Sequence, residues 1–195
     1  MKKTNLIVAL AMGLVSAQVY GQGTVTFGNN SASAITNAFT MARVVAGTTF
    51  RVALYYLPDG PEPSRDEMLL TGLSVGANAP IAPAAGLYAA GTRTTPVTTP
   101  GAGFAWFQVR CWETAFGTSY EAAVANAVPQ NGRLAIAGTS NIIRVKTGDP
   151  VNNIAPGALT AFGLQTFLVT QVPEPTTIGL AAMGIGALLL SRRKK

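Results

Sequence analysis

Two stretches of alternating residues constrain the fold of this chain more than any other feature of its sequence. They are residues 49–57 (TFRVALYYL) and residues 104–113 (FAWFQVRCWE). A period of two places successive side chains on opposite faces of a β-strand. In the second stretch one face carries Phe107, Val109 and Cys111, and the other carries Trp106, Gln108, Arg110 and Trp112. Because large apolar side chains occur on both faces, the pattern predicts a central strand under a covering layer.

Glycine and proline divide the rest of the chain into short segments. The 195 residues include 21 glycines and 12 prolines, which interrupt helices and strands. Further strands are predicted at residues 24–27, 68–75, 87–90, 133–137, 141–146 and 159–169. One helix is predicted within residues 117–129 (GTSYEAAVANAVP), with Thr118 as N-cap and Glu121 completing a capping box. We therefore expect a mainly β fold over residues 22–171: a single antiparallel β-sandwich or jelly-roll-like domain with one short helix.

Residues 1–21 have the pattern of a secretory signal peptide. Lys2 and Lys3 precede an apolar run at residues 6–15, and small residues follow. The run is too short to span a membrane comfortably, because a spanning helix needs about 20 apolar residues. We expect cleavage after Gly21 or after Ala17, and export of the rest of the chain.

Residues 172–195 (VPEPTTIGLAAMGIGALLLSRRKK) predict a tail that enters a membrane. Residues 178–190 carry no charge and can form a short transmembrane helix if the bilayer thins or the flanking cations snorkel. The positive-inside rule then holds the basic end in the cytoplasm, namely Arg192, Arg193, Lys194 and Lys195. Pro173 and Pro175 keep the segment before the span extended, which displays Glu174 at the membrane surface.

This tail resembles the PEP-CTERM protein-sorting signal of Gram-negative bacteria, in which Pro-Glu-Pro precedes a short transmembrane helix and a basic end. Pro173, Glu174 and Pro175 match that motif residue for residue. The resemblance implies recognition by exosortase, a membrane enzyme with a catalytic cysteine, in hosts that typically make exopolysaccharide or biofilm. It also implies a transient stage in the inner membrane, followed by the cell envelope, the outer surface or the extracellular matrix.

Other segments extend the resemblance or limit it. The segments QGTVTFGNN, FQVRCWE, GTSYEAAVAN and FGLQTFLVTQVPEP resemble exported PEP-CTERM proteins of the Verrucomicrobia type, which have no assigned activity. A second Pro-Glu-Pro occurs at residues 61–63, but no apolar span follows it. We interpret this internal copy as a loop.

Charge and residue types exclude several functions. The formal charge of +6 comes from the four terminal cations together with Lys2 and Lys3, and the interior of the chain is neutral. Nucleic-acid binding needs a concentrated cationic face, which this distribution does not provide. The chain has no histidine, which excludes Ser-His-Asp and Cys-His catalysis and removes a common zinc ligand. The single cysteine, Cys111, is expected to be a buried apolar residue, and we expect no metal site and no cofactor.

Three groups of side chains leave other functions open. They are Glu113 with Glu121, which could form a glycosidase pair; Asp59, Glu62, Asp66 and Glu67, which could bind calcium; and Trp106 with Trp112, which could stack on sugars. A structural role is the simpler interpretation of each group. We expect a non-enzymatic surface or matrix protein with a structural or interaction role linked to exopolysaccharide or biofilm. A carbohydrate-binding module is the alternative, and a carboxylate-based hydrolase is a more distant one.

Overall fold

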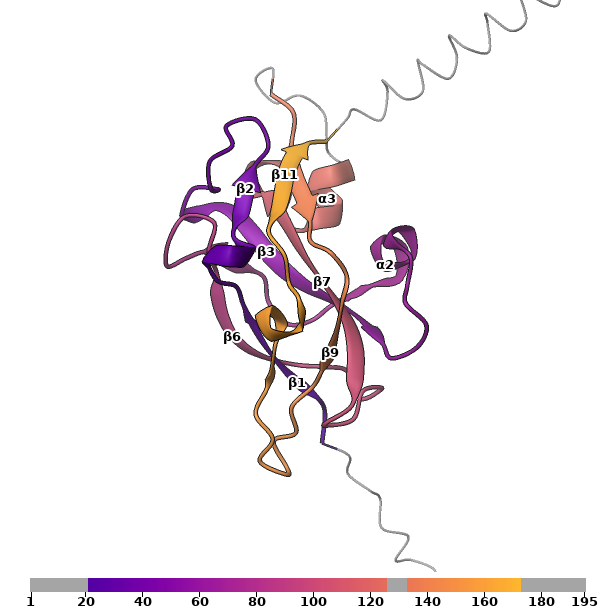
Figure 1. Cartoon of the computed structure of the whole chain (residues 1–195). Helices are drawn as coiled ribbons and strands as arrows, with labels where there is room; N and C mark the ends of the chain where they lie inside the picture. Colours follow the sequence, from indigo (N-terminus) through magenta and orange to yellow (C-terminus); the bar gives the residue numbers. More distant parts are fainter. Residues whose placement is uncertain (1–20, 126–132, 173–195) are drawn as a thin grey trace, which may run out of the picture.

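Two β-sheets enclose the main hydrophobic core of the protein (Figure 1). The computed structural model describes residues 21–125 and 133–172. The small sheet consists of β1 (Thr24–Gly28), β6 (Ala89–Thr94) and β10 (Gly157–Ala158), in the order β10-β1-β6. The strands of the large sheet are β2 (Ile35–Asn37), β3 (Gly47–Pro58), β4 (Leu73–Ser74), β5 (Ala79–Ile81), β7 (Phe104–Glu113), β8 (Ile136–Thr139), β9 (Ile143–Lys146) and β11 (Phe167–Gln171). Their order is β2-β11-β8-β7-β3-β4, with β5 also paired to β3 and β9 to β7. The predicted mainly β, two-sheet fold is confirmed.

The two stretches of strongest alternation lie side by side at the centre of the large sheet. β3 and β7 pair in antiparallel register from Phe50 opposite Glu113 to Pro58 opposite Ala105. The side chains that face the small sheet are fully buried, among them Val52, Leu54, Phe107, Val109 and Cys111. Burying an apolar side chain of this size stabilises the fold by about 1.5–3 kcal/mol. The inward-facing side chains of β3 and β7, which the alternation predicts, therefore form the centre of the core.

A second apolar cluster covers the opposite face of the large sheet. It joins Tyr55 of β3 and Trp112 of β7 to Phe116 and to Ala123 of helix α3 (Tyr120–Ala125). A 3-10 turn, η2 (Thr114–Phe116), connects β7 to this layer. β7 is thus buried on both faces, as the sequence predicts.

The start of α3 differs from the predicted capping box. The helix begins at Tyr120, and the hydroxyl of Ser119, not that of Thr118, accepts the Ala122 N–H at 3.1 Å. With Ser119 as the N-cap, Glu121 is the second residue of the helix and not the third, and its carboxylate pairs with Arg110 of β7. The predicted continuation at residues 126–129 lies outside the described residues.

A second helix, α2 (Arg65–Thr71), occurs where the sequence analysis predicts a strand. The Ser64 hydroxyl caps it by accepting the Glu67 N–H at 3.1 Å, and two acids in the first turn favour the positive end of the helix dipole. The strand prediction at residues 68–75 is therefore wrong over α2 and holds only for the two residues of β4.

The predicted final strand is also divided. Leu159–Phe162 forms a 3-10 turn, η3, which ends at Gly163 with a left-handed φ of 94°, and only then does β11 begin. Another 3-10 turn, η1 (Ser31–Ser33), leads into β2. The sheets are antiparallel except at two places, where β1 pairs with β10 and β2 pairs with β11 in parallel.

The described part of the chain enters and leaves at opposite ends of the molecule. It starts at the end marked by the beginning of β1 and finishes after β11, near α3 (Figure 1). Within residues 21–125 and 133–172, no helix is long and apolar enough to cross a membrane. The predicted signal peptide (1–21, apart from Gly21), Pro173-Glu174-Pro175, the span at 178–190 and the basic end at 192–195 lie outside the described residues.

Candidate functional site

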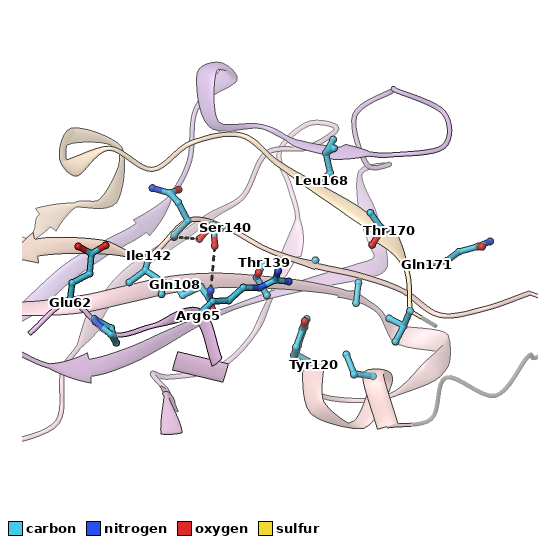
Figure 2. A pocket seen from close by; sticks show the side chains of 16 residues that line it. Glu62, Arg65, Gln108, Tyr120, Thr139, Ser140, Ile142, Leu168, Thr170 and Gln171 are labelled. Atoms are coloured by element: carbon cyan, nitrogen blue, oxygen red, sulfur yellow. Dashed lines mark hydrogen bonds between the residues drawn. The ribbon is translucent and has the colours of Figure 1, made fainter. Parts of the chain in front are cut away.

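A groove of about 710 Å³ lies on the outer face of the large sheet, beside the end of β11 (Figure 2). Its floor comes from β7 and β8, through Gln108, Ala137, Gly138 and Thr139. Its walls come from α3, from β11 and from the segment that leads into α2, through Tyr120, Thr170, Gln171, Glu62 and Arg65. Five separate parts of the chain therefore build this groove.

Gly138 allows β11 to lie close enough to form one wall. A Cβ at this position would collide with the carbonyl oxygen of Leu168 and would lie 3.0 Å from the Cα of Val169. Both neighbours are backbone atoms of β11, which cannot turn aside as a side chain can. Residue 138 of β8 must therefore be a glycine for β11 to pack this closely beside it.

Several polar side chains of the floor are used to hold the groove together. The Ser140 hydroxyl accepts the Val109 N–H at 2.9 Å and donates to the Asn141 carbonyl at 2.7 Å. Gln108 donates its amide to the Ser140 carbonyl at 3.3 Å, and Asn141 donates its amide to the Gly163 carbonyl at 3.0 Å. These bonds fix the segment between β8 and β9.

Other polar groups of the groove remain available to a ligand. The side chains of Tyr120 and Thr170 make no hydrogen bond to the described parts of the protein, and they face each other from two walls, whereas the Gln171 side chain points away from the groove (Figure 2). Thr139 adds a hydroxyl from the floor. The groove thus offers three neutral hydroxyl groups, one of them on an aromatic ring, together with the charged side chains of Glu62 and Arg65.

Beneath the groove, Arg110 connects β7 to both helices. Its side chain is 1% exposed and stacks on the Tyr55 ring, with the guanidinium carbon 3.6 Å from the ring centroid. It donates to the Met68 carbonyl of α2 at 2.5 Å, to Glu121 Oε1 of α3 at 2.8 Å and to Gln108 Oε1 at 3.1 Å. We call Arg110, Tyr55, Gln108 and Glu121 the Arg110 cluster. It fixes α2 and α3 on the sheet and so sets the width of the groove.

The pKa values of three titratable groups in this region are shifted away from neutral pH. Burial alone would raise the pKa of Glu121, but the hydrogen bond from the Tyr55 hydroxyl at 2.9 Å, with its own backbone N–H and Arg110, keeps that pKa below the usual value. Burial, and then the Glu121 carboxylate, raise the pKa of Tyr55. Burial also raises the pKa of Tyr120. General acid–base catalysis favours a group whose pKa lies near the working pH. The shifts of Glu121, Tyr55 and Tyr120 instead move the pKa of each group further from neutral pH.

The two tryptophans do not form a pair of exposed rings. Trp112 is 1% exposed, and its indole N–H donates to the Gly117 carbonyl at 3.0 Å. Trp106 is half-buried, donates to the Gly60 carbonyl at 3.1 Å and lines a separate cavity of about 130 Å³. Trp112 is a core residue, so sugar stacking across both rings is excluded.

The two candidate catalytic glutamates belong to different ion pairs. Glu113 is buried and pairs with Arg133, whereas Glu121 pairs with Arg110. A glycosidase pair needs two carboxyl groups that face one substrate across a cleft. Each of these carboxylates instead faces its own arginine.

The acids of the segment before α2 are also separated. Asp59 forms a two-fold ion pair with Arg144 at 2.8 and 2.9 Å, while Asp66 and Glu67 lie in the first turn of α2 and Glu62 lines the groove. Among residues 21–125 and 133–172, no three acidic, cysteine or histidine side chains are grouped so that they could hold a metal ion. The internal Pro61-Glu62-Pro63 is a loop, as predicted.

Cys111 lies in the main core, as the sequence predicts. It is 0% exposed, and burial raises the pKa of its thiol. The thiol is therefore uncharged at neutral pH and unreactive.

Comparison with known proteins identifies a sorting motif at residues 171–195. The family model of the PEP-CTERM protein-sorting motif matches residues 171–195, which include Pro173-Glu174-Pro175 and the basic end. No curated protein and no solved structure matches the chain. The match begins in the last residue of β11, so the sorting motif directly continues the strand that forms one wall of the groove. The chain is therefore an exported, envelope-directed protein that carries the PEP-CTERM protein-sorting motif at residues 171–195 and is sorted by the exosortase system.

Proposed function

We propose that the described domain is a non-enzymatic surface or matrix protein whose groove binds the exopolysaccharide of its own cell. The chain would pass through the inner membrane of a Gram-negative host, be processed by exosortase at Pro173-Glu174-Pro175, and remain in the envelope or the matrix. In this role the tail is a substrate of exosortase, and the domain is the part that is displayed in the envelope or the matrix. Residues 192–195 would hold the tail in the cytoplasm before processing.

The lining of the groove is the observation that carries the binding role. A neutral polysaccharide offers many hydroxyl groups and apolar ring faces, which suit amide and hydroxyl side chains together with an aromatic ring. Tyr120 and Thr170 supply these groups on two facing walls, and Thr139 supplies a further hydroxyl from the floor. Glu62 and Arg65 also line the groove, and because their charges are opposite, the lining as a whole has no net charge.

A carboxylate-based hydrolase is not supported by any pair of groups in this groove. Glu121 is held by Arg110 and Tyr55, and its pKa is lowered, whereas a catalytic acid needs a raised pKa. The groove is therefore better suited to binding than to hydrolysis.

Binding to the host's purified exopolysaccharide tests this role. Replacing Tyr120 with phenylalanine and Thr170 with valine in one chain should lower the amount that sediments with the polymer by at least threefold, because one hydroxyl group is lost from each of the two facing walls. The matched control is Thr94→Val, an exposed threonine on the small sheet. Equal sedimentation of all three proteins would contradict the proposed groove.

Processing is tested separately in a host that contains exosortase. Glu174→Ala should cause unprocessed precursor to accumulate in the inner membrane, since the span and the basic end remain but the displayed carboxylate is lost. Glu62→Ala, in the internal Pro-Glu-Pro loop, should be processed like the unchanged protein. Normal processing of Glu174→Ala would show that the enzyme does not need the displayed carboxylate.

A further inference from the structure

An uncharged loop beside the end of β11 exposes two large apolar side chains. Residues 38–42 (AFTMA) follow β2, and Phe39 is 59% exposed and Met41 73% exposed. We propose that this loop is a lipid-contacting element, which rests on the membrane surface while the tail still anchors the chain. The inference rests on the membrane stage of the proposed function.

The loop is held in one conformation although its apolar side chains have no cover. The side-chain oxygen of Asn37 accepts the Phe39 N–H at 2.9 Å, and the Asn37 carbonyl accepts the Met41 N–H at 2.9 Å. The Asn37 N–H in turn donates to the Ala42 carbonyl at 2.8 Å, and Met41 adopts a left-handed φ of 53°. These bonds fix the backbone of the loop, in which both side chains are exposed.

The pairing of β2 with β11 places this loop where the chain departs toward its tail. The two strands are parallel, with Phe167 opposite Ile35 and Val169 opposite Asn37, and the Ala38 N–H donates to the Val169 carbonyl at 3.0 Å. Because parallel strands leave a sheet in the same direction, residues 38–42 and the end of β11 lie at the same end of the molecule (Figure 1).

The length of the chain sets how far a bilayer can lie from this end. Five residues, 173–177, separate Val172 from the apolar run that begins at residue 178. Even fully extended, the chain from Val172 to that run spans at most about 20 Å. The headgroup layer takes up roughly 5–7 Å of this distance. The end of β11 therefore stands within roughly 15 Å of the headgroups, and a modest tilt brings the loop into them.

A lipid surface fits this patch better than a protein does. A stable protein interface buries about 1,200–2,000 Å² in total, which is more than a five-residue loop supplies. Contact with lipid needs only a few apolar side chains, because the tail already holds the chain at the membrane. Another exposed apolar residue, Val151, packs near Gly21 at the opposite end and provides a natural comparison.

A fluorescent label on the loop tests the contact in the full chain. The chain is reconstituted into vesicles of phosphatidylethanolamine and phosphatidylglycerol, and an environment-sensitive dye is attached to Thr40→Cys or, as the control, to Val151→Cys. Cys111 is fully buried and does not compete for the dye. We expect a lipid-borne quencher to quench the dye at residue 40 at least threefold more than the dye at residue 151. Adding Phe39→Ser and Met41→Ser should abolish this difference.

The other outcomes separate this inference from the function on which it rests. Equal quenching at residues 40 and 151, in a chain that floats with the vesicles, would overturn the loop contact and leave the membrane stage intact. A chain that fails to float would overturn the membrane stage, and the loop contact with it. A dye response at residue 40 that appears without vesicles and grows with protein concentration would show that a second copy covers the loop, which also overturns the lipid contact.

Discussion

Replacing Arg110 with methionine should destabilise the domain by at least about 3 kcal/mol, although the two side chains have similar length. The carboxamide oxygen of the buried Gln108 loses its donor at 3.1 Å, which costs about 1–3 kcal/mol. The Met68 carbonyl loses a donor at 2.5 Å but keeps the Gly72 N–H, so its loss is nearer to 1 kcal/mol. Loss of the guanidinium from the Tyr55 ring removes about another 1 kcal/mol. Glu121 contributes little, because its side chain is 52% exposed and water can replace the arginine.

Thermal unfolding followed by circular dichroism measures this effect. For a domain of this size, about 3 kcal/mol lowers the melting temperature by roughly 10 °C. Arg144→Met is the matched control, since Arg144 also pairs with a carboxylate, Asp59, and lies over an aromatic ring, Phe104, but is 45% exposed. Its loss should cost less than about 1 kcal/mol. Similar melting temperatures for the two variants would refute the view that burial gives the Arg110 cluster its strength.

Three further changes test other parts of the fold by thermal unfolding. Gly138→Ala should destabilise the domain by about 2–3 kcal/mol, because the new Cβ collides with the backbone of β11. Gly60→Ala is the control and should be neutral, because a Cβ at this position has no neighbour within 4 Å. Equal effects of the two changes would contradict the close approach of β8 and β11. Ser64→Ala should cost about 1 kcal/mol through loss of the α2 cap, and no change would contradict capping. Because the folded pKa of Glu121 lies below its ordinary value of 4.5, its contribution is present above pH 4.5 and is lost as pH falls through the folded pKa. Glu121→Gln should therefore flatten the loss of melting temperature below pH 4.5, and an unchanged slope would contradict this role.

The sheet faces could be predicted from the sequence because alternation needs no knowledge of distant residues. Residues 104–113 form β7 with the predicted bounds, and Phe107 and Trp112 face the predicted sides. The sequence also places Arg110 on the face shared by Trp106, Gln108 and Trp112. It does not show that Arg110 is buried there, because α2 and α3, which cover it, come from parts of the chain before and after β7.

Helix α2 was missed although a signal for it was present. Ser64 and Glu67 have the spacing of a helix start, and Ser64 does cap the helix. The helix is only seven residues long, and its apolar residues from Met68 onward resemble a short strand. So short a helix depends on tertiary contacts, here the bond from Arg110 to the Met68 carbonyl. The groove could not be predicted for the same reason, since its walls meet only in the folded protein.

The position of β11 has a mechanical consequence. The sorting motif follows this strand directly in the sequence, and β11 pairs with β2 through residues 167–169 and with β8 through Thr170 and Gln171. A pull directed along β11 acts across these hydrogen bonds and loads the bonds to both neighbours together. The described chain begins at the opposite end of the molecule, and tension between the two ends therefore runs through the length of the sheets (Figure 1). A domain built in this way can be held by its C-terminal end against drag without peeling apart at the point of attachment.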